Sequence, residues 1–253
     1  MKSIITNLST KLFIISFVLF SATGIAQLKN VSVDSFDKVI VSPHVSVTFV
    51  KGETEDVTVH TSTEPIEKFN VEVEGSTLRL YLDGAKMVTK NEKVKDHRGK
   101  RKKAIYKGTV ITATVTYKKL DELSLRGEEK MVCESAINQP KFALTIYGES
   151  QVYLNEVNLD NLTTTIYGES YLELKKGTVE KQKITAYGET TVNTLEVDTK
   201  STKITAYGEG NYRVAVADRL KVTAYGEATI AYEGSPEVNK GIVIGEATIQ
   251  KIN

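Results

Sequence analysis

Apolar and polar residues alternate along most of the chain, and in its second half the alternation recurs with a fixed period. Each repeat centres on a glycine. In most repeats apolar residues stand four and two positions before it with a threonine or serine between them, as in Ile184, Thr185 and Ala186 before Gly188. Alternation resumes after the glycine, as at Val192. This period of two, rich in β-branched residues, predicts strands with one buried face.

The repeated glycine begins a Gly-Glu pair that recurs at intervals of 21, 20, 20, 20, 18 and 19 residues. The seven glycines of these pairs are Gly127, Gly148, Gly168, Gly188, Gly208, Gly226 and Gly245. A fixed period in this range indicates a solenoid, in which each repeat buries its apolar face only by stacking on its neighbours. No segment has sustained helical periodicity, so we expect an all-β protein, a parallel β-helix with coils of about 20 residues.

In a stack of β-coils, equivalent residues of successive repeats lie about 4.8 Å apart, and identical positions form ladders. The glycine is expected at a corner, because it tolerates the positive φ that such corners need. The glutamate after it is expected on the solvated rim. Cys133, the single cysteine, falls in register with core residues, so we expect a small buried hydrophobe and no reactive thiol.

The N-terminal half also alternates, in short strands separated by turn-like Lys51-Gly52 and Glu74-Gly75-Ser76. Its order is Phe36-x-x-Val39-x-Val41, Val45-x-Val47, Val57-x-Val59, Val71-x-Val73 and Leu78-x-Leu80-x-Leu82. Followed by glycine-containing coils, this order resembles the putative auto-transporter adhesin family with a head GIN domain, which is frequent in exported proteins of Bacteroidetes. The resemblance covers roughly residues 36 to 250 and implies a right-handed parallel β-helix outside the cytoplasm. The family usually has Ser-Gly or Gly-x-Gly corners, whereas this chain has Tyr-Gly-Glu corners. This departure does not change the expected fold, but the resemblance does not imply that the ligand is shared.

Residues 1–26 have the pattern of a signal peptide: basic Lys2 and Lys11, an apolar run over 12–20, and small residues up to Ala26. We therefore expect export to the periplasm, the outer membrane surface or the extracellular space. The mature chain, 27–253, is expected to be one β-helix domain. Its parts are N-terminal coils over 36–125, interrupted by a basic insertion at 86–103, and Tyr-Gly-Glu coils over 126–253.

A tyrosine directly precedes five of the repeated glycines, and its place in the alternation predicts an outward side chain. These candidate binding residues are Tyr147, Tyr167, Tyr187, Tyr207 and Tyr225. Two interpretations remain open. The stripe is either a structural ladder that packs coil on coil, or a docking face for a glycan, a peptide or another protein.

The glutamate ladder is a candidate for cation binding, at Glu149, Glu169, Glu189 and Glu209, because calcium accepts carboxylate oxygens. Catalysis is not expected, since acid–base chemistry needs one pair of carboxylates in different environments and the repeats supply near-equivalent ones. The sequence has no nucleophile elbow, phosphate-binding glycine loop or CxxC pair, so no cofactor and no catalytic residue is assigned.

Residues 86–103 contain nine lysines and arginines and only two acids, Glu92 and Asp96. We expect a solvated loop or hairpin tip; a functional version would contact acidic surface polymers or lipid headgroups. Nucleic acid is not expected as a partner, because the segment has no aromatic residue to stack on bases. The sequence thus favours a non-enzymatic, adhesin-like exported protein that binds a glycan or an envelope protein. The alternatives are a structural or self-associating scaffold and, less favoured, a polysaccharide-processing enzyme.

Overall fold

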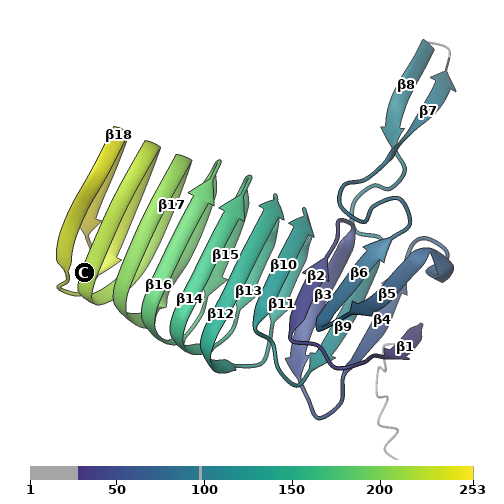
Figure 1. The fold of residues 1–253 in the computed structure, drawn as a ribbon. Coiled ribbons are helices and arrows are strands. Elements are labelled where there is room, and N and C mark those ends of the chain that lie inside the picture. Colours follow the sequence, from purple (N-terminus) through teal and green to yellow (C-terminus); the bar gives the residue numbers. More distant parts are fainter. Residues whose placement is uncertain (1–27, 97–98, 253) are drawn as a thin grey trace, which may run out of the picture.

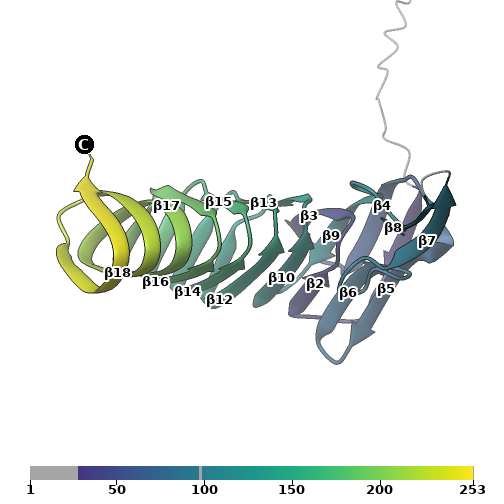
Figure 2. The ribbon, with the colours of Figure 1, turned by 90° about the horizontal axis from the view of Figure 1, so that it is seen from above.

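The chain folds into a β-solenoid of about six turns, without α-helix in the part that the structure describes. The computed structural model describes residues 28–96 and 99–252, so the predicted signal peptide lies outside the described residues. Figures 1 and 2 show the coils stacked side by side along one axis, with the C-terminal coil at one end and the N-terminal strands at the other. This arrangement confirms the parallel β-helix predicted from the repeat.

Two walls of parallel strands form the solenoid. The first wall contains β2 (Lys38–Val41), β10 (Glu122–Gly127), β12 (Ile137–Gly148), β14 (Val157–Tyr167) and β16 (Gly177–Tyr187). The second contains β3 (Val45–Lys51), β11 (Lys130–Cys133), β13 (Gln151–Leu154) and β15 (Ser170–Leu174). Both walls continue into β17 (Thr190–Glu233), which winds through successive corners and pairs with β18 (Glu237–Lys251).

The corner glycines adopt the conformation that the spacing predicts. All seven have positive φ, between 106° and 129°. Close approach of the backbone adds a second requirement for glycine: a Cβ on Gly168 would lie 2.4 Å from the carbonyl oxygen of Gly148 in the preceding coil. The same carbonyl of Gly148 accepts a hydrogen bond of 2.9 Å from the buried Ser170 hydroxyl. The corner is therefore built from a glycine and a serine two residues later.

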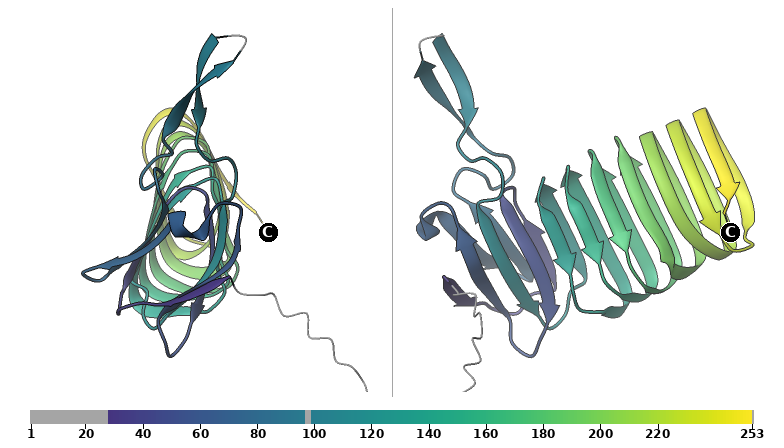
Figure 3. Two further views of the ribbon diagram at one scale, coloured as in Figure 1. Left: turned by 90° about the vertical axis from the view of Figure 1, so that its right-hand side faces the viewer. Right: turned by 180° about the vertical axis from the view of Figure 1, so that it is seen from behind.

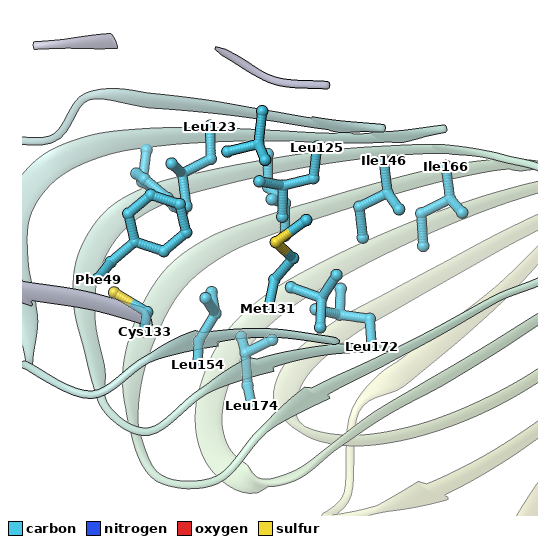
Figure 4. Packing of buried hydrophobic residues seen from close by; sticks show 14 of the residues in the cluster. Phe49, Leu123, Leu125, Met131, Cys133, Ile146, Leu154, Ile166, Leu172 and Leu174 are labelled. Carbon is cyan, nitrogen blue, oxygen red and sulfur yellow. The ribbon is translucent and has the colours of Figure 1, made fainter. Parts of the chain in front are cut away.

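The core is one continuous apolar cluster enclosed by the two walls. Figure 4 shows side chains of both walls meeting inside the coils, among them Phe49, Leu125 and Met131. Cys133 is 1% exposed, which confirms its assignment to the core. Burial raises the pKa of its thiol to about 11, and the Tyr117 hydroxyl lies 3.7 Å from its sulfur. An uncharged buried thiol behaves as a small hydrophobe.

The N-terminal part departs from the expectation of coils throughout 36–125. β6 (Thr77–Leu82) and β9 (Ile111–Tyr117) do extend the two walls in parallel. However, β5 (Phe69–Glu74) is antiparallel to β6, β4 (Asp56–Ser62) is antiparallel to β9, and β1 (Lys29–Ser32) is antiparallel to β4. A parallel pair needs a crossover of a dozen or more residues, whereas only Gly75 and Ser76 separate β5 from β6. The antiparallel strands close this end of the solenoid, with a 3₁₀ turn at Ile66–Lys68.

The basic insertion forms an antiparallel hairpin of β7 (Asn91–Asp96) and β8 (Gly99–Ala104). The two strands make a sheet of their own, separate from the main sheet. In Figures 1 and 3 the hairpin projects away from the N-terminal end of the solenoid. The expectation of a hairpin is confirmed; His97 and Arg98 at its tip lie outside the described residues.

Candidate binding face

The five predicted tyrosines form a continuous ladder on the outer face of the first wall. The strand register aligns Tyr147 with Tyr167, Tyr167 with Tyr187, and Tyr187 with Tyr207. Neighbouring ring centroids, Tyr207 to Tyr225 included, are 4.7–5.0 Å apart with interplanar angles of 3–6°. The first four side chains are 38–40% exposed, and Tyr225 is half-buried. The outward direction expected from the alternation is confirmed.

Stacking determines what this ladder presents to solvent. Because the rings are parallel and in contact, each inner ring has both of its faces covered by its neighbours. The face of Tyr147 that looks toward the N-terminus is covered by the guanidinium of Arg126, 5.3 Å from the ring centroid. At the other end, Tyr225 is in register with Ile244. The stripe thus exposes ring edges and hydroxyl groups, and it offers no open row of ring faces for a sugar to stack on.

Two further rows run beside the tyrosines on the same outer face. Two residues before each tyrosine stands a half-buried threonine, at Thr145, Thr165, Thr185, Thr205 and Thr223. Beyond the threonines, three successive coils carry exposed cationic side chains that we call the basic row. Four residues before the tyrosine stand Lys183, Lys203 and Lys221, and two residues further out stand Lys181 and Arg219. Within the described part of the chain, none of these five cations has an ion-pair partner. The sequence analysis missed the basic row, although lysine four residues before the tyrosine was visible in three successive repeats.

The glutamates after the corner glycines form an exposed acidic rim on the other side of the tyrosines. Glu149, Glu169, Glu189 and Glu209 are all exposed. Among the described residues, no three His, Cys, Asp or Glu side chains are grouped so that they could hold a metal ion. The outer face therefore carries positive charge on one side of the hydroxyl rows and negative charge on the other.

A groove of about 520 Å³ lies where the N-terminal end meets the first two corners. Its wall is formed on one side by Met87, Val88 and Thr89, and on the other by Arg126 and Tyr147. The tyrosine ladder ends at this groove. Arg126 stands in the tyrosine position of its coil, in register with Tyr147.

Beside the groove lies a buried acid that the sequence analysis did not single out. Glu129 occupies the inward position where the next coils have Ser150 and Ser170, and its side chain is 4% exposed. Burial raises its pKa, although the backbone N–H of Glu128 and the nearby His44 favour its charged form. The signal was present, since the first corner reads Gly-Glu-Glu where the next two read Gly-Glu-Ser and none of the later ones has a second acid.

His44 is held firmly against this acid. Its Nδ1 lies 4.0 Å from a Glu129 oxygen and 2.7 Å from the Gly108 carbonyl, and its Nε2 lies 2.6 Å from the Thr89 hydroxyl. It is also the one described non-glycine residue with positive φ, at 71°. These contacts tie the segments on both sides of the hairpin to the first corner, so their evident role is to fix the N-terminal end on the coils.

Comparison with known proteins identifies the family. The family model described as "Putative auto-transporter adhesin, head GIN domain" matches residues 35–236. No curated protein matches the chain. Within the described ranges, no helix has both the length and the apolar character needed to cross a bilayer.

Solved structures of similar fold come from Bacteroidales. A putative adhesin from Bacteroides fragilis superposes with a TM-score of 0.75 at 17% identity, over 88% of this chain and 95% of that one. A putative adhesin from Parabacteroides merdae gives 0.63 at 18% identity, over 89% and 95%. A putative lipid binding protein from Parabacteroides distasonis gives 0.65 at 18% identity, over 89% and 96%. At these identities the likeness concerns the fold.

Proposed function

Because the chain belongs to the family of putative auto-transporter adhesins with a head GIN domain, we propose that it is an exported, non-enzymatic, adhesin-like protein that binds an extended acidic glycan. The glycan lies along the outer face of the first wall, over the threonine row, with its acidic groups toward the basic row. The observation that carries this proposal is the row of five unpaired cations running parallel to two rows of hydroxyl groups.

The geometry favours a polymer over a small molecule. The tyrosine hydroxyls recur at the spacing of the coils, with ring centroids 4.7–5.0 Å apart. Such a series offers the same hydrogen-bonding groups at each step, which suits a ligand that is itself repetitive. Threonine side chains are shorter than the lysines and tyrosines beside them, so a chain of sugars is accommodated between the two longer rows.

Charge favours an acidic glycan over a neutral one. The unpaired cations attract carboxylates, and charge-assisted hydrogen bonds are stronger than neutral ones. The acidic rim at Glu149, Glu169, Glu189 and Glu209 lies on the far side of the tyrosines and repels the same ligand. Together the two charged rows keep the polymer over the threonines.

Two alternatives follow from the same face. The stacked rings themselves support a purely structural role for the tyrosines, as a ladder that stabilises the coils. A polysaccharide-processing enzyme has less support, because the glutamates repeat in equivalent exposed positions and acid–base chemistry needs two carboxyl groups in unlike environments.

The test is a titration of the mature protein with a polyuronate and with a neutral glucan of similar length. We expect the polyuronate alone to bind, with an affinity that falls as salt rises. Lys183→Gln/Lys203→Gln removes two cations of the basic row and should weaken binding roughly tenfold, since tenfold corresponds to about 1.4 kcal/mol. Tyr167→Phe/Tyr187→Phe removes two hydroxyls but keeps the stacked rings, and should weaken it by a smaller factor.

Lys93→Gln/Lys102→Gln serves as the matched control, because it removes the same charge from the hairpin. It should weaken polyuronate binding much less than Lys183→Gln/Lys203→Gln does. If the neutral glucan binds equally well, or if the two lysine pairs have equal effects, the basic row is not the binding site. If neither Lys183→Gln/Lys203→Gln nor Tyr167→Phe/Tyr187→Phe changes polyuronate binding, the ladder has the purely structural role.

A further inference from the structure

The hairpin of β7 and β8 has a register that places like charges opposite one another. Lys93 is the ladder partner of Lys102, and Lys95 is the partner of Lys100. Alternate residues of a strand share a face, so these four positions belong to one face of the hairpin. We call it the four-lysine face. The acids Glu92 and Asp96 occupy positions of the opposite face.

This arrangement is unfavourable for an isolated hairpin. Like charges directly opposite each other destabilise a strand pair, and a two-stranded hairpin alone is marginally stable in water. Here the hairpin has no strand pairing with the main sheet. Lys93 and Lys102 are exposed, and neither forms an ion pair with another residue that the structure describes. A surface of negative charge would relieve the repulsion.

Apolar side chains are exposed at the foot of the same hairpin. Met87 is 59% exposed and Val88 is 76% exposed, four and three residues before β7 begins. They form the wall of the 520 Å³ groove that faces Arg126 and Tyr147. The backbone N–H of Lys90 donates to the Gly84 carbonyl, close to the end of β6, and the N–H of Ile105 donates to the Lys90 carbonyl, which joins the two legs of the hairpin at its foot. Projecting basic strands and exposed apolar residues are thus held together on one element.

We propose that the hairpin docks on the surface of an anionic lipid bilayer. The four-lysine face lies against the headgroups, and Met87 and Val88 enter the interfacial region. A basic surface alone attracts any polyanion, but apolar side chains gain from contact only with an apolar phase. Lysines near an anionic bilayer each add to binding, and apolar insertion supplies the second contribution that stable attachment needs. This site shares no residue with the face proposed to bind glycan.

The test is co-sedimentation of the mature protein with vesicles of phosphatidylcholine containing about a third phosphatidylglycerol, against vesicles of phosphatidylcholine alone. The wild type should bind the anionic vesicles alone, and should dissociate as salt is raised. The variant Lys93→Gln/Lys95→Gln/Lys100→Gln/Lys102→Gln should lower the partition coefficient at least tenfold. Met87→Ser/Val88→Ser should lower it severalfold with the charge unchanged.

Lys183→Gln/Lys203→Gln is the matched control and should bind the vesicles like the wild type. The same pair is expected to weaken glycan binding in the proposed function. A failure of one proposal can therefore be told apart from a failure of the other. Far-UV circular dichroism and urea midpoints check that each variant is folded; should the quadruple variant misfold, Lys93→Gln/Lys102→Gln gives the same comparison. Equal binding to both kinds of vesicle, or vesicle binding that survives the lysine substitutions, overturns the proposal. The proposal is also overturned if two results occur together: soluble polyphosphate binds with the same dependence on the lysines, and Met87→Ser/Val88→Ser leaves vesicle binding unchanged. The ligand of the hairpin would then be an acidic polymer.

Discussion

The guanidinium carbon of Arg126 lies 5.3 Å from the ring centroid of Tyr147, so a cation closes the N-terminal end of the tyrosine ladder. Arg126 stands in register with Tyr147 and takes the tyrosine position of its own coil. As a result, the ladder is a closed stack with edges and hydroxyls outward. Ring stacking and ligand contact therefore depend on different parts of the same side chains, and substitutions can separate them.

Removing one ring from the middle of the ladder should destabilise the solenoid. Tyr187 stacks on both Tyr167 and Tyr207, and each aromatic pair contributes about 0.5–1.5 kcal/mol. We expect Tyr187→Ala to lower the free energy of unfolding by about 1–3 kcal/mol, measured by urea denaturation. Tyr187→Phe keeps the stack and should stay within about 0.5 kcal/mol of the wild type, as other surface substitutions do. Equal losses for the two variants would mean that the hydroxyl, and not the stack, stabilises the coils.

The corner glycines should not tolerate even alanine. At Gly168 a Cβ meets the Gly148 carbonyl oxygen at 2.4 Å and φ is +114°, so strain and overlap add. We expect Gly168→Ala to cost about 2–5 kcal/mol in urea unfolding, as the sum of backbone strain and overpacking. Gly75→Ala is the matched control, because Gly75 has φ +62° with nothing within 4 Å of its Cβ position. It should cost only about 1 kcal/mol. Similar costs at both positions would rule out the close approach as a cause.

The thiol of Cys133 should be protected in the native protein. It is 1% exposed, and burial raises its pKa to about 11, so little thiolate is present or accessible at pH 8. We expect no reaction with an aromatic disulfide reagent until urea unfolds the chain. The control is Thr191→Cys in a Cys133→Ala background, since Thr191 is exposed and its replacement should react without urea. Rapid native modification of Cys133 would contradict its assignment to the core.

Stability should depend on pH through Glu129. Burial raises the folded-state pKa of this carboxyl above its ordinary value of 4.5, so the folded chain binds the proton more tightly than the unfolded chain. Stability therefore falls as pH rises from the ordinary pKa through the folded pKa, and this loss is absent below that window. Glu129→Gln cannot titrate. We expect the wild type to lose stability relative to this variant in urea unfolding as the pH rises above the ordinary pKa of 4.5. A difference that is independent of pH would show that burial does not penalise the charge.

The repeated part of the fold was predictable because each coil imposes the same physical requirement. The glycine spacing predicted the corners, and the alternation placed Tyr167 outward and Cys133 inward. The antiparallel β4 and β5 were not predictable in this way, because an alternating strand has the same pattern in either direction and only the length of its connections distinguishes them. The stacking of Tyr187 on Tyr167 and Tyr207 was one of the two interpretations left open, because alternation fixes the outward direction of a side chain and does not fix its rotamer.

The candidate site was predicted in part. The tyrosines were identified, but the basic row was missed because lysines at Lys183 and Lys203 look like ordinary surface residues until the register aligns them. Glu129 was not predicted as a buried acid, because by residue type alone it looks the same as the exposed glutamate directly before it. In both cases a comparison of the same position across all repeats would have revealed the residue: the recurring lysine in the first case and the glutamate in place of serine in the second.

The extended acidic glycan proposed to lie along the threonine row beside the stacked tyrosines is tested most directly by the affinity of uronate oligomers of increasing length. If the ligand runs along the coils, the affinity should rise with each added sugar until the oligomer spans the ladder from Tyr147 to Tyr225, and should then level off. Lys183→Gln/Lys203→Gln should flatten this rise. An affinity that is the same for a single uronate and for the long polymer would contradict the account.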